Sequence, residues 1–115
     1  MRIFRVGWSE QAEKGLAVSA GEDMGFIRRE VQAGISILWQ CESDSNFGYA
    51  VTRFEPPGEI VFVCGEGSGL REFAPHFVAA AKSKNLTIRT HVKRKGLIRF
   101  WASVGLELDE YVLRG

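Results

Sequence analysis

The stretch EIVFVCGEGSGL, residues 59–70, decides the fold of this chain. Its first part, residues 59–64, is an apolar run without alternation, which predicts a strand buried on both faces in the middle of a sheet. Three glycines follow within five residues and predict a sharp turn, where the backbone can approach a ligand closely because no Cβ intervenes. A helical pattern begins at residue 70, so free N–H groups and the positive end of a helix dipole would face an anion here. The segment therefore predicts a cradle for a phosphate or pyrophosphate.

The residues of this segment leave two questions open. A glycine-rich connection between a strand and a helix often binds nothing, so the pattern alone does not establish a ligand. Pro75 lies inside the expected helix, residues 70–84, where it removes one N–H group and crowds the preceding turn. The helix is either kinked at Pro75 or begins near Ala74, and the second alternative would weaken the dipole at the glycines.

The composition is that of one ordinary globular domain spanning residues 1–115. Hydrophobic residues make up 45% of the chain, and a net charge of +1 gives no global field that would favour nucleic acid or a membrane surface. Cys41 and Cys64 have neither metal-ligand nor disulfide-framework spacing, so we expect free thiols. No stretch predicts a signal peptide or a membrane span, and we therefore expect a cytoplasmic protein.

Periodicity along the chain predicts the element order β-α-α-β-β-β-α-β-α-β. Ser9 and Asp23 stand where they can cap the first two helices. The expected strands are 1–6, 35–42, 47–54, 59–64, 86–92 and 106–113, and the expected helices are 10–20, 24–32, 70–84 and 97–104.

The connections between the expected strands predict their directions. A turn at residues 44–46 joins 35–42 to 47–54 as an antiparallel hairpin, and the short link to 59–64 makes that strand antiparallel as well. A helix separates 59–64 from 86–92, so these two strands should be parallel. The fold class is therefore α/β, with a mixed, mostly antiparallel sheet flanked by helices. Strand 35–42 should be half-buried, because one of its faces is apolar: Ile35, Ile37, Trp39 and Cys41.

This order, with a glycine loop after the fourth strand, resembles the GNAT superfamily of acyl-CoA-dependent N-acyltransferases over essentially the whole chain. Gly67-Ser68-Gly69 resembles the G-x-G/A of the pyrophosphate loop in that family. Residues 98–106, IRFWASVGL, look like its last helix, in which an aromatic pair is followed by three residues, a glycine and an apolar residue. Small GNAT-like proteins of this kind are familiar from phage and prophage genomes. The chain ends at the sixth expected strand, and a partner subunit that supplied a seventh would make a homodimer.

The resemblance implies an N-acetyltransferase that moves an acetyl group from acetyl-CoA to an unidentified amine on a small molecule or a protein. Carried over by position, Val63 and Cys64 would meet the pantetheine arm between the fourth and fifth strands. The acceptor pocket would come from the loop between the first two helices, residues 21–24, which has no recognisable motif. The pyrophosphate would be lined by Gly65, Gly67, Ser68, Gly69 and Leu70.

A basic cluster, which includes Arg89, Arg94 and Arg99, lies beside the cleft that the resemblance implies. It could be a solvated face, a seat for the 3′-phosphate of CoA through Arg94, or a small nucleic-acid contact. The net charge of +1 argues against the last of these. We therefore expect neither a nucleic acid nor a membrane as partner.

Two residues are candidates for proton transfer. A carboxylate on or beside the fourth strand often serves as general base in the family, which points to Glu59, although a residue at a strand start is commonly solvated. The tyrosine that usually serves as acid in the last helix is replaced by Trp101, whose indole N–H is not a useful acid. Tyr111 on the last strand could substitute for it, or could simply pack there. Glu66, which would oppose a pyrophosphate, is expected to point to solvent.

These departures from the family pattern support an alternative function. Cys64 stands where the family has Gln or Arg, and Trp101 stands where it has Tyr. A catalytically inactive GNAT-like fold, phage-encoded and serving as a binding or structural module, would tolerate both. Cys64 before a helix N-terminus also allows a thiol nucleophile, and Tyr49 could line an acceptor pocket or pack across strands.

Overall fold

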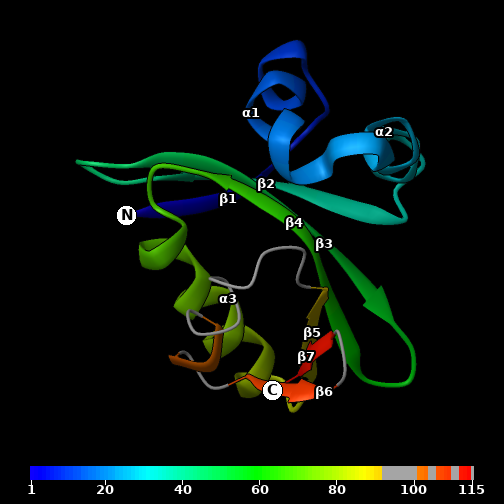
Figure 1. Cartoon of the computed structure of the whole chain (residues 1–115), viewed down its shortest axis with the longest axis vertical. Coiled ribbons are helices and arrows are strands. Elements are labelled where there is room, and N and C mark those ends of the chain that lie inside the picture. Colours follow the sequence, from blue (N-terminus) through cyan, green and yellow to red (C-terminus); the bar gives the residue numbers. More distant parts are fainter. Residues whose placement is uncertain (92–100, 104–105, 110–111, 115) are drawn as a thin grey trace.

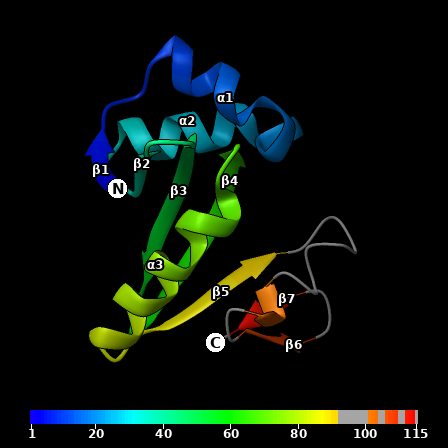
Figure 2. The same ribbon diagram turned by 90° about the vertical axis from the view of Figure 1, so that its left-hand side faces the viewer.

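The computed structural model describes residues 1–91, 101–103, 106–109 and 112–114. A seven-stranded sheet forms its centre, with the strand order β1-β2-β3-β4-β5-β7-β6. Helices cover both faces of the sheet (Figures 1 and 2). The strands are β1 (Arg2–Val6), β2 (Ser36–Glu42), β3 (Phe47–Glu55), β4 (Glu59–Gly67), β5 (Thr87–His91), β6 (Glu107–Asp109) and β7 (Val112–Arg114).

Two helices, joined by a short 3-10 turn, cover one face of the sheet. They are α1 (Glu10–Ala20) and α2 (Met24–Gln32), with the turn η1 (Gly21–Asp23) between them. The side chain of Ser9 accepts a hydrogen bond from the N–H of Ala12 at 3.1 Å, so the expected cap of the first helix is confirmed. Asp23 precedes α2 as expected, but its side chain makes no capping hydrogen bond.

The other face is covered by α3 (Leu70–Ser83), which begins directly after the glycines. Pro75 lies inside this helix, so the alternative start near Ala74 is wrong. Because the helix begins at Leu70, the positive end of its dipole lies beside the glycines, as predicted. None of the helices in the described residues is both long and apolar enough to cross a bilayer.

Strands β2 and β3 are packed on both sides, which corrects the expectation of a half-buried strand. Leu38 and Val51 lie under α1 and α2, whereas the indole of Trp39 faces α3. The centroids of the Trp39 and Phe77 rings are 6.2 Å apart. Ile35, predicted to face the core, lies outside the strand and is 57% exposed. The alternation in the sequence reflects two buried faces rather than one.

The observed boundaries of two expected strands, 59–64 and 106–113, differ from the predicted ones. β4 continues to Gly67, so Gly65 and Gly67 belong to a strand rather than to a loop. The segment expected as one strand, 106–113, forms the β6–β7 hairpin instead, and β7 pairs with β5. The seventh strand comes from the chain itself, so the expectation that the chain stops at a sixth strand is wrong, and the argument for a homodimer that rested on a missing strand no longer applies.

Candidate functional site

In the described part of the chain, the pairs between β4 and β5 lie in the first half of β4. Their parallel pairs extend from Glu59 with Thr87 to Phe62 with Thr90, where the Thr90 hydroxyl donates to the Phe62 carbonyl oxygen at 3.1 Å. Directly after Phe62 the register between β3 and β4 shifts, so that Val63 is an extra residue in β4. Such a bulge bends its strand and is common next to active sites. The bulge therefore marks the place where the two strands part.

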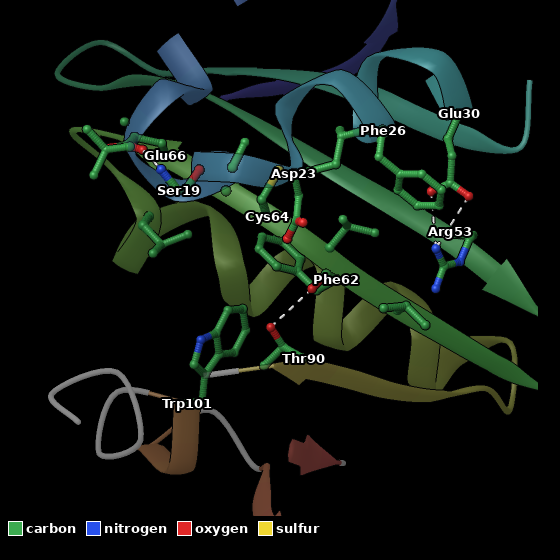
Figure 3. A pocket seen from close by; sticks show the side chains of 18 residues that line it. Ser19, Asp23, Phe26, Glu30, Arg53, Phe62, Cys64, Glu66, Thr90 and Trp101 are labelled. Carbon is green, nitrogen blue, oxygen red and sulfur yellow. Dashed lines mark hydrogen bonds and ion pairs between the residues drawn. The ribbon is translucent and has the colours of Figure 1, made fainter. Parts of the chain in front are cut away.

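A pocket of about 470 Å³ opens where the strands part (Figure 3). Residues 61–67 of β4 form its floor, Leu70 comes from α3, and Trp101 and Thr90 close it on the α3 side. From the other face α1, η1 and α2 contribute a wall that includes Asp23 and Phe26. A volume of this size is typical of small-molecule sites. The pocket is thus reached by elements from both faces of the sheet.

The Glu66 side chain points toward α1, not into solvent as expected. One of its carboxylate oxygens, Oε2, accepts a hydrogen bond from the backbone N–H of Ser19 at 2.7 Å. Figure 3 shows this pair at one end of the pocket. Because α3 lies on the opposite face, the carboxylate is turned away from the helix N-terminus where an anion was expected.

The glycines of the deciding stretch let the protein pack closely against itself. A Cβ on Gly65 would lie 2.6 Å from the ring of Phe62, and one on Gly69 would lie 2.5 Å from the Cβ of Asn46. Gly67 has a φ of +143° and touches the backbone of Gly48. Sequence reasoning identified the right residues as special, but the close approach is to neighbouring residues of the chain.

Ser68 ties the end of β4 to the beginning of β3. Its N–H donates to the Phe47 carbonyl oxygen at 3.1 Å, and its hydroxyl accepts from the Phe47 N–H at 3.1 Å. The N–H groups of Glu72 and Phe73 both donate to the Gly69 carbonyl oxygen at 2.9 Å. Helical geometry leaves the earlier N–H groups of α3 without intrahelical acceptors, and no side chain caps this end. An anion would therefore meet N–H groups at residues 69–71 rather than at Ser68.

Glu72, in the first turn of α3, fastens this helix to the β2–β3 turn. Its Oε2 accepts hydrogen bonds from the Asn46 amide at 2.6 Å and from the Ser43 hydroxyl at 3.0 Å. These hydrogen bonds hold the pKa of the Glu72 carboxyl below its ordinary value of 4.5, and the one from Asn46 has the largest effect. The contacts fix the position of the helix N-terminus beside the pocket.

The lowered pKa of Glu72 predicts a pH-dependent contribution to stability. A carboxyl whose folded-state pKa is depressed stabilises the fold above its unfolded pKa, and the contribution is lost as the pH falls through the folded pKa. In urea unfolding from pH 7 to pH 3, wild type should therefore lose more stability than Glu72→Gln. Glu10→Gln, which changes an exposed first-turn residue of α1, is the matched control. Parallel pH curves for wild type and Glu72→Gln would contradict this role.

Glu59 does not reach the pocket. It begins β4, seven residues before Glu66 and about 23 Å away along an extended strand. Its carboxylate forms an ion pair with Arg89 at 3.3 Å, and Arg89 also pairs with Glu55 at 2.7 Å. The solvated alternative for Glu59 does not hold either, since its side chain is only 21% exposed. Arg89, the member of the basic cluster whose side chain is described, is engaged with carboxylates.

The ion pairs continue from Glu55 to the wall of the pocket. Arg53 donates to Glu55 at 2.7 Å and to Glu30 at 3.1 Å, and both Arg53 and Glu30 line the pocket. The hydrogen bond from Arg53 holds the pKa of the Glu55 carboxyl below its ordinary value. The guanidinium of Arg53 is thus committed to two carboxylates.

Aromatic residues close the α3 side of the pocket. Trp101 is 3% exposed, and its ring lies 5.1 Å from that of Phe62. Tyr49 packs instead against Phe47 at 5.2 Å and under Gly15, where a Cβ would lie 2.8 Å from its ring. The packing interpretation of Tyr49 therefore fits, whereas an acceptor-pocket role does not.

Two of the candidate residues, Tyr111 and Arg94, lie outside the described residues. The two cysteines are free and buried. Cys64 lines the pocket. Cys41 does not, and burial raises the pKa of its thiol to about 11. Among the described residues there is no cluster of His, Cys, Asp and Glu that could hold a metal ion.

The sequence reasoning missed Asp23 as a site residue. Its carboxylate reaches into the pocket beside Cys64 and toward Phe62 (Figure 3). The resemblance implied that the segment between the first two helices builds an acceptor pocket, so it indicated the location of Asp23 without singling out its side chain. Its capping position concealed the role, because an aspartate before a helix is ordinarily interpreted as an N-cap.

The fold defined by the split β4–β5 pair, with α1 and α2 on one face and α3 on the other, is that of the GNAT acetyltransferases. A Bacillus subtilis acetyltransferase solved in complex with CoA superposes with a TM-score of 0.73 at 9% identity, over 98% of this chain and 95% of that one. An IAA acetyltransferase from Bacillus cereus superposes with a TM-score of 0.71 at 13% identity, over 95% of this chain and 78% of that one. A GNAT-family protein from Desulfovibrio desulfuricans superposes with a TM-score of 0.68 at 11% identity, over 99% of this chain and 97% of that one.

Identities of 9 to 13% establish a shared fold and leave activity to be argued from the site. No protein-family model matches this sequence, and no curated protein matches it. The predicted fold class, a mixed and mostly antiparallel sheet flanked by helices, is confirmed.

Proposed function

We propose that this protein is an acyl-CoA-dependent N-acetyltransferase that acts on an amine. The parting of β4 from β5 at the Val63 bulge carries the proposal, because it opens a pocket across the sheet beside the N-terminus of α3. The solved acetyltransferases that share this fold support it, one of them being a complex with CoA.

The residues around the split fit acetyl-CoA in three respects. In the part of the chain that the structure describes, the β4–β5 pairs end at Phe62, and we place an extended pantetheine arm beside the next β4 residues, Val63 and Cys64. The first turn of α3 offers N–H groups and a positive dipole end to the pyrophosphate. Glu66, the carboxylate within the glycine-rich stretch, is held on the opposite face by the backbone N–H of Ser19.

When bound, the thioester would supply the acetyl group. A substrate that arrives as an ammonium ion gives up two protons as the C–N bond forms and the C–S bond breaks: the CoA sulfur takes up one, and the other passes to solvent. The chain must then position the amine and accept its proton. Asp23 is our candidate for the general base, since its carboxylate reaches over β4 at the bulge. Glu66 is less well placed, because its carboxylate is held against α1.

The first experiment is calorimetric titration of acetyl-CoA into wild type and Arg71→Glu. Arg71 is exposed in the first turn of α3, so the substitution places a negative charge where the pyrophosphate would bind. We expect micromolar binding by wild type and a loss of at least about tenfold in the variant, which is about 1.4 kcal/mol. Lys82→Glu, with the same change of charge in the last turn of α3, should bind as wild type does. No binding by wild type at millimolar acetyl-CoA would overturn the proposal.

A second candidate function, a catalytically inactive GNAT-like fold that serves as a binding or structural module, is favoured by one observation. Among the described residues that line the pocket there is no tyrosine, and Trp101 is part of its wall. An indole N–H donates hydrogen bonds but is not an acid for a leaving thiolate. Binding of acetyl-CoA without release of the CoA thiol in the presence of any amine would select this candidate.

A further inference from the structure

The wall of the pocket on the α1–α2 side has a distinctive composition. α1, η1 and α2 cross above the β4 bulge and contribute Val18, Asp23 and Phe26. If the thioester lies along the β5 side of β4, an acceptor must enter beneath this wall. The side chains there should therefore match the acceptor chemically.

The charges in the pocket favour a cation. Among the described residues that line it, the charged side chains are three carboxylates, Asp23, Glu30 and Glu66, and one guanidinium, Arg53, which together give a formal net charge of −2. Arg53 is bound by Glu30 at 3.1 Å and by Glu55 at 2.7 Å, so it is not available to pair with an anionic substrate. An acceptor that carries a carboxylate or phosphate would meet repulsion here, whereas an ammonium group would be attracted.

Apolar side chains at the mouth of the pocket favour a hydrophobic body on the acceptor. Phe26 is 55% exposed and Val18 is 65% exposed, and both line the pocket. Ile27, Val61 and Val63 continue this apolar surface inward. Exposed phenyl and isopropyl groups that rim a concave site are typical of a binding surface. Figure 3 shows Phe26 above the floor of β4, on the same side as Asp23.

We propose that the acceptor is a primary amine carried on an apolar body and lacking negative charge, of which 2-phenylethylamine is a simple representative. Its ammonium group lies at Asp23, and its apolar body covers Phe26 and Val18. This inference rests on the proposed acetyl transfer. It excludes free amino acids, whose carboxylate would enter a negatively charged pocket, and it disfavours polyamines, which have no apolar body.

The test compares three amines in an acetylation assay that measures release of the CoA thiol. Phenylalanine differs from 2-phenylethylamine by its carboxylate, and 1,4-diaminobutane is a cation without the phenyl group. We expect kcat/KM for 2-phenylethylamine to exceed that of either other amine by at least about tenfold. Phenylalanine or 1,4-diaminobutane as an equal or better substrate would overturn the inference.

Phe26→Ala and Phe54→Ala form a matched pair of variants. Phe54 is 51% exposed, close to Phe26 in exposure, but does not line the pocket. Phe26→Ala should raise KM for 2-phenylethylamine at least about fivefold while changing kcat less, and Phe54→Ala should leave both within twofold. Equal effects of the two substitutions would contradict a role for Phe26 in acceptor binding.

Binding of the amine, measured without turnover, separates failure of this inference from failure of the proposed reaction. Saturation-transfer NMR with 2-phenylethylamine reports contact with the protein whether or not acetyl transfer occurs. A signal in wild type and in Phe54→Ala that is lost in Phe26→Ala would support the acceptor site even if no amine were acetylated. Absence of the signal in wild type, with acetyl-CoA binding intact, would overturn the acceptor site alone.

Discussion

Gly67→Ala should lower the free energy of unfolding by about 3 kcal/mol, the largest loss of stability that we expect from any single methyl group in this chain. Gly67 has a φ of +143°, a conformation that L side chains rarely adopt. A Cβ there would lie 2.4 Å from the Cα of Gly48 and 2.4 Å from the carbonyl oxygen of Phe47. Both neighbours are backbone atoms of the paired strand, so they cannot move aside as a flexible side chain would.

Urea unfolding of Gly67→Ala and Gly7→Ala measures this effect. Gly7 is exposed, has no positive φ, and a Cβ there meets no atom within 4 Å, so its substitution should change stability by no more than about 0.5 kcal/mol. Equal stabilities for the two variants would show that β3 and β4 do not approach this closely at Gly48. The same crowding makes any Gly67 variant unsuitable as a test of acetyl-CoA binding, because loss of binding could follow from loss of the strand pairing.

The apolar run of residues 59–64 was enough to predict the central strand, because burial on both faces is a local property of the sequence. The end of that strand was not predictable in the same way. Glycine is depleted in strands, so Gly65 and Gly67 indicated a loop. Gly67 is tolerated in β4 because Gly48 faces it from β3, and this pairing depends on a register between residues far apart in the chain.

The same limit explains which of the candidate residues line the pocket and which do not. Val63, Cys64 and Leu70 follow directly from the strand and helix that carry them, and all three line the pocket. Glu59 was a reasonable carboxylate on the fourth strand, but its pairing with Arg89 depends on how β4 and β5 align. A local pattern can place a residue on a strand, whereas its distance from a pocket is set by tertiary structure.

Asp23→Asn is expected to lower kcat for acetyl transfer by at least about 100-fold, the range in which removal of a general base usually falls. Asparagine keeps the size of the side chain but cannot accept the proton of the amine at neutral pH. The Asp23 side chain makes no capping hydrogen bond with α2, so the substitution removes no helix cap, and the melting temperatures of wild type and variant are compared to show that the fold is kept. The affinity for acetyl-CoA, which is proposed to lie along β4 and α3, should also stay within twofold.

Separate measurement of kcat and KM distinguishes a base from a residue that only shapes the pocket. Asp23→Asn should lower kcat by a larger factor than it raises KM for the amine, whereas loss of a residue that only shapes the pocket should mainly raise KM. Glu22→Gln changes the neighbouring residue of η1, which is exposed and does not line the pocket, and it should behave as wild type does. If Asp23→Asn keeps more than a third of the wild-type kcat, Glu66 becomes the remaining pocket carboxylate on β4 that could take the proton. Glu66→Gln would then have to lower kcat by at least about 100-fold, although it would also weaken the hydrogen bond that holds α1 at Ser19.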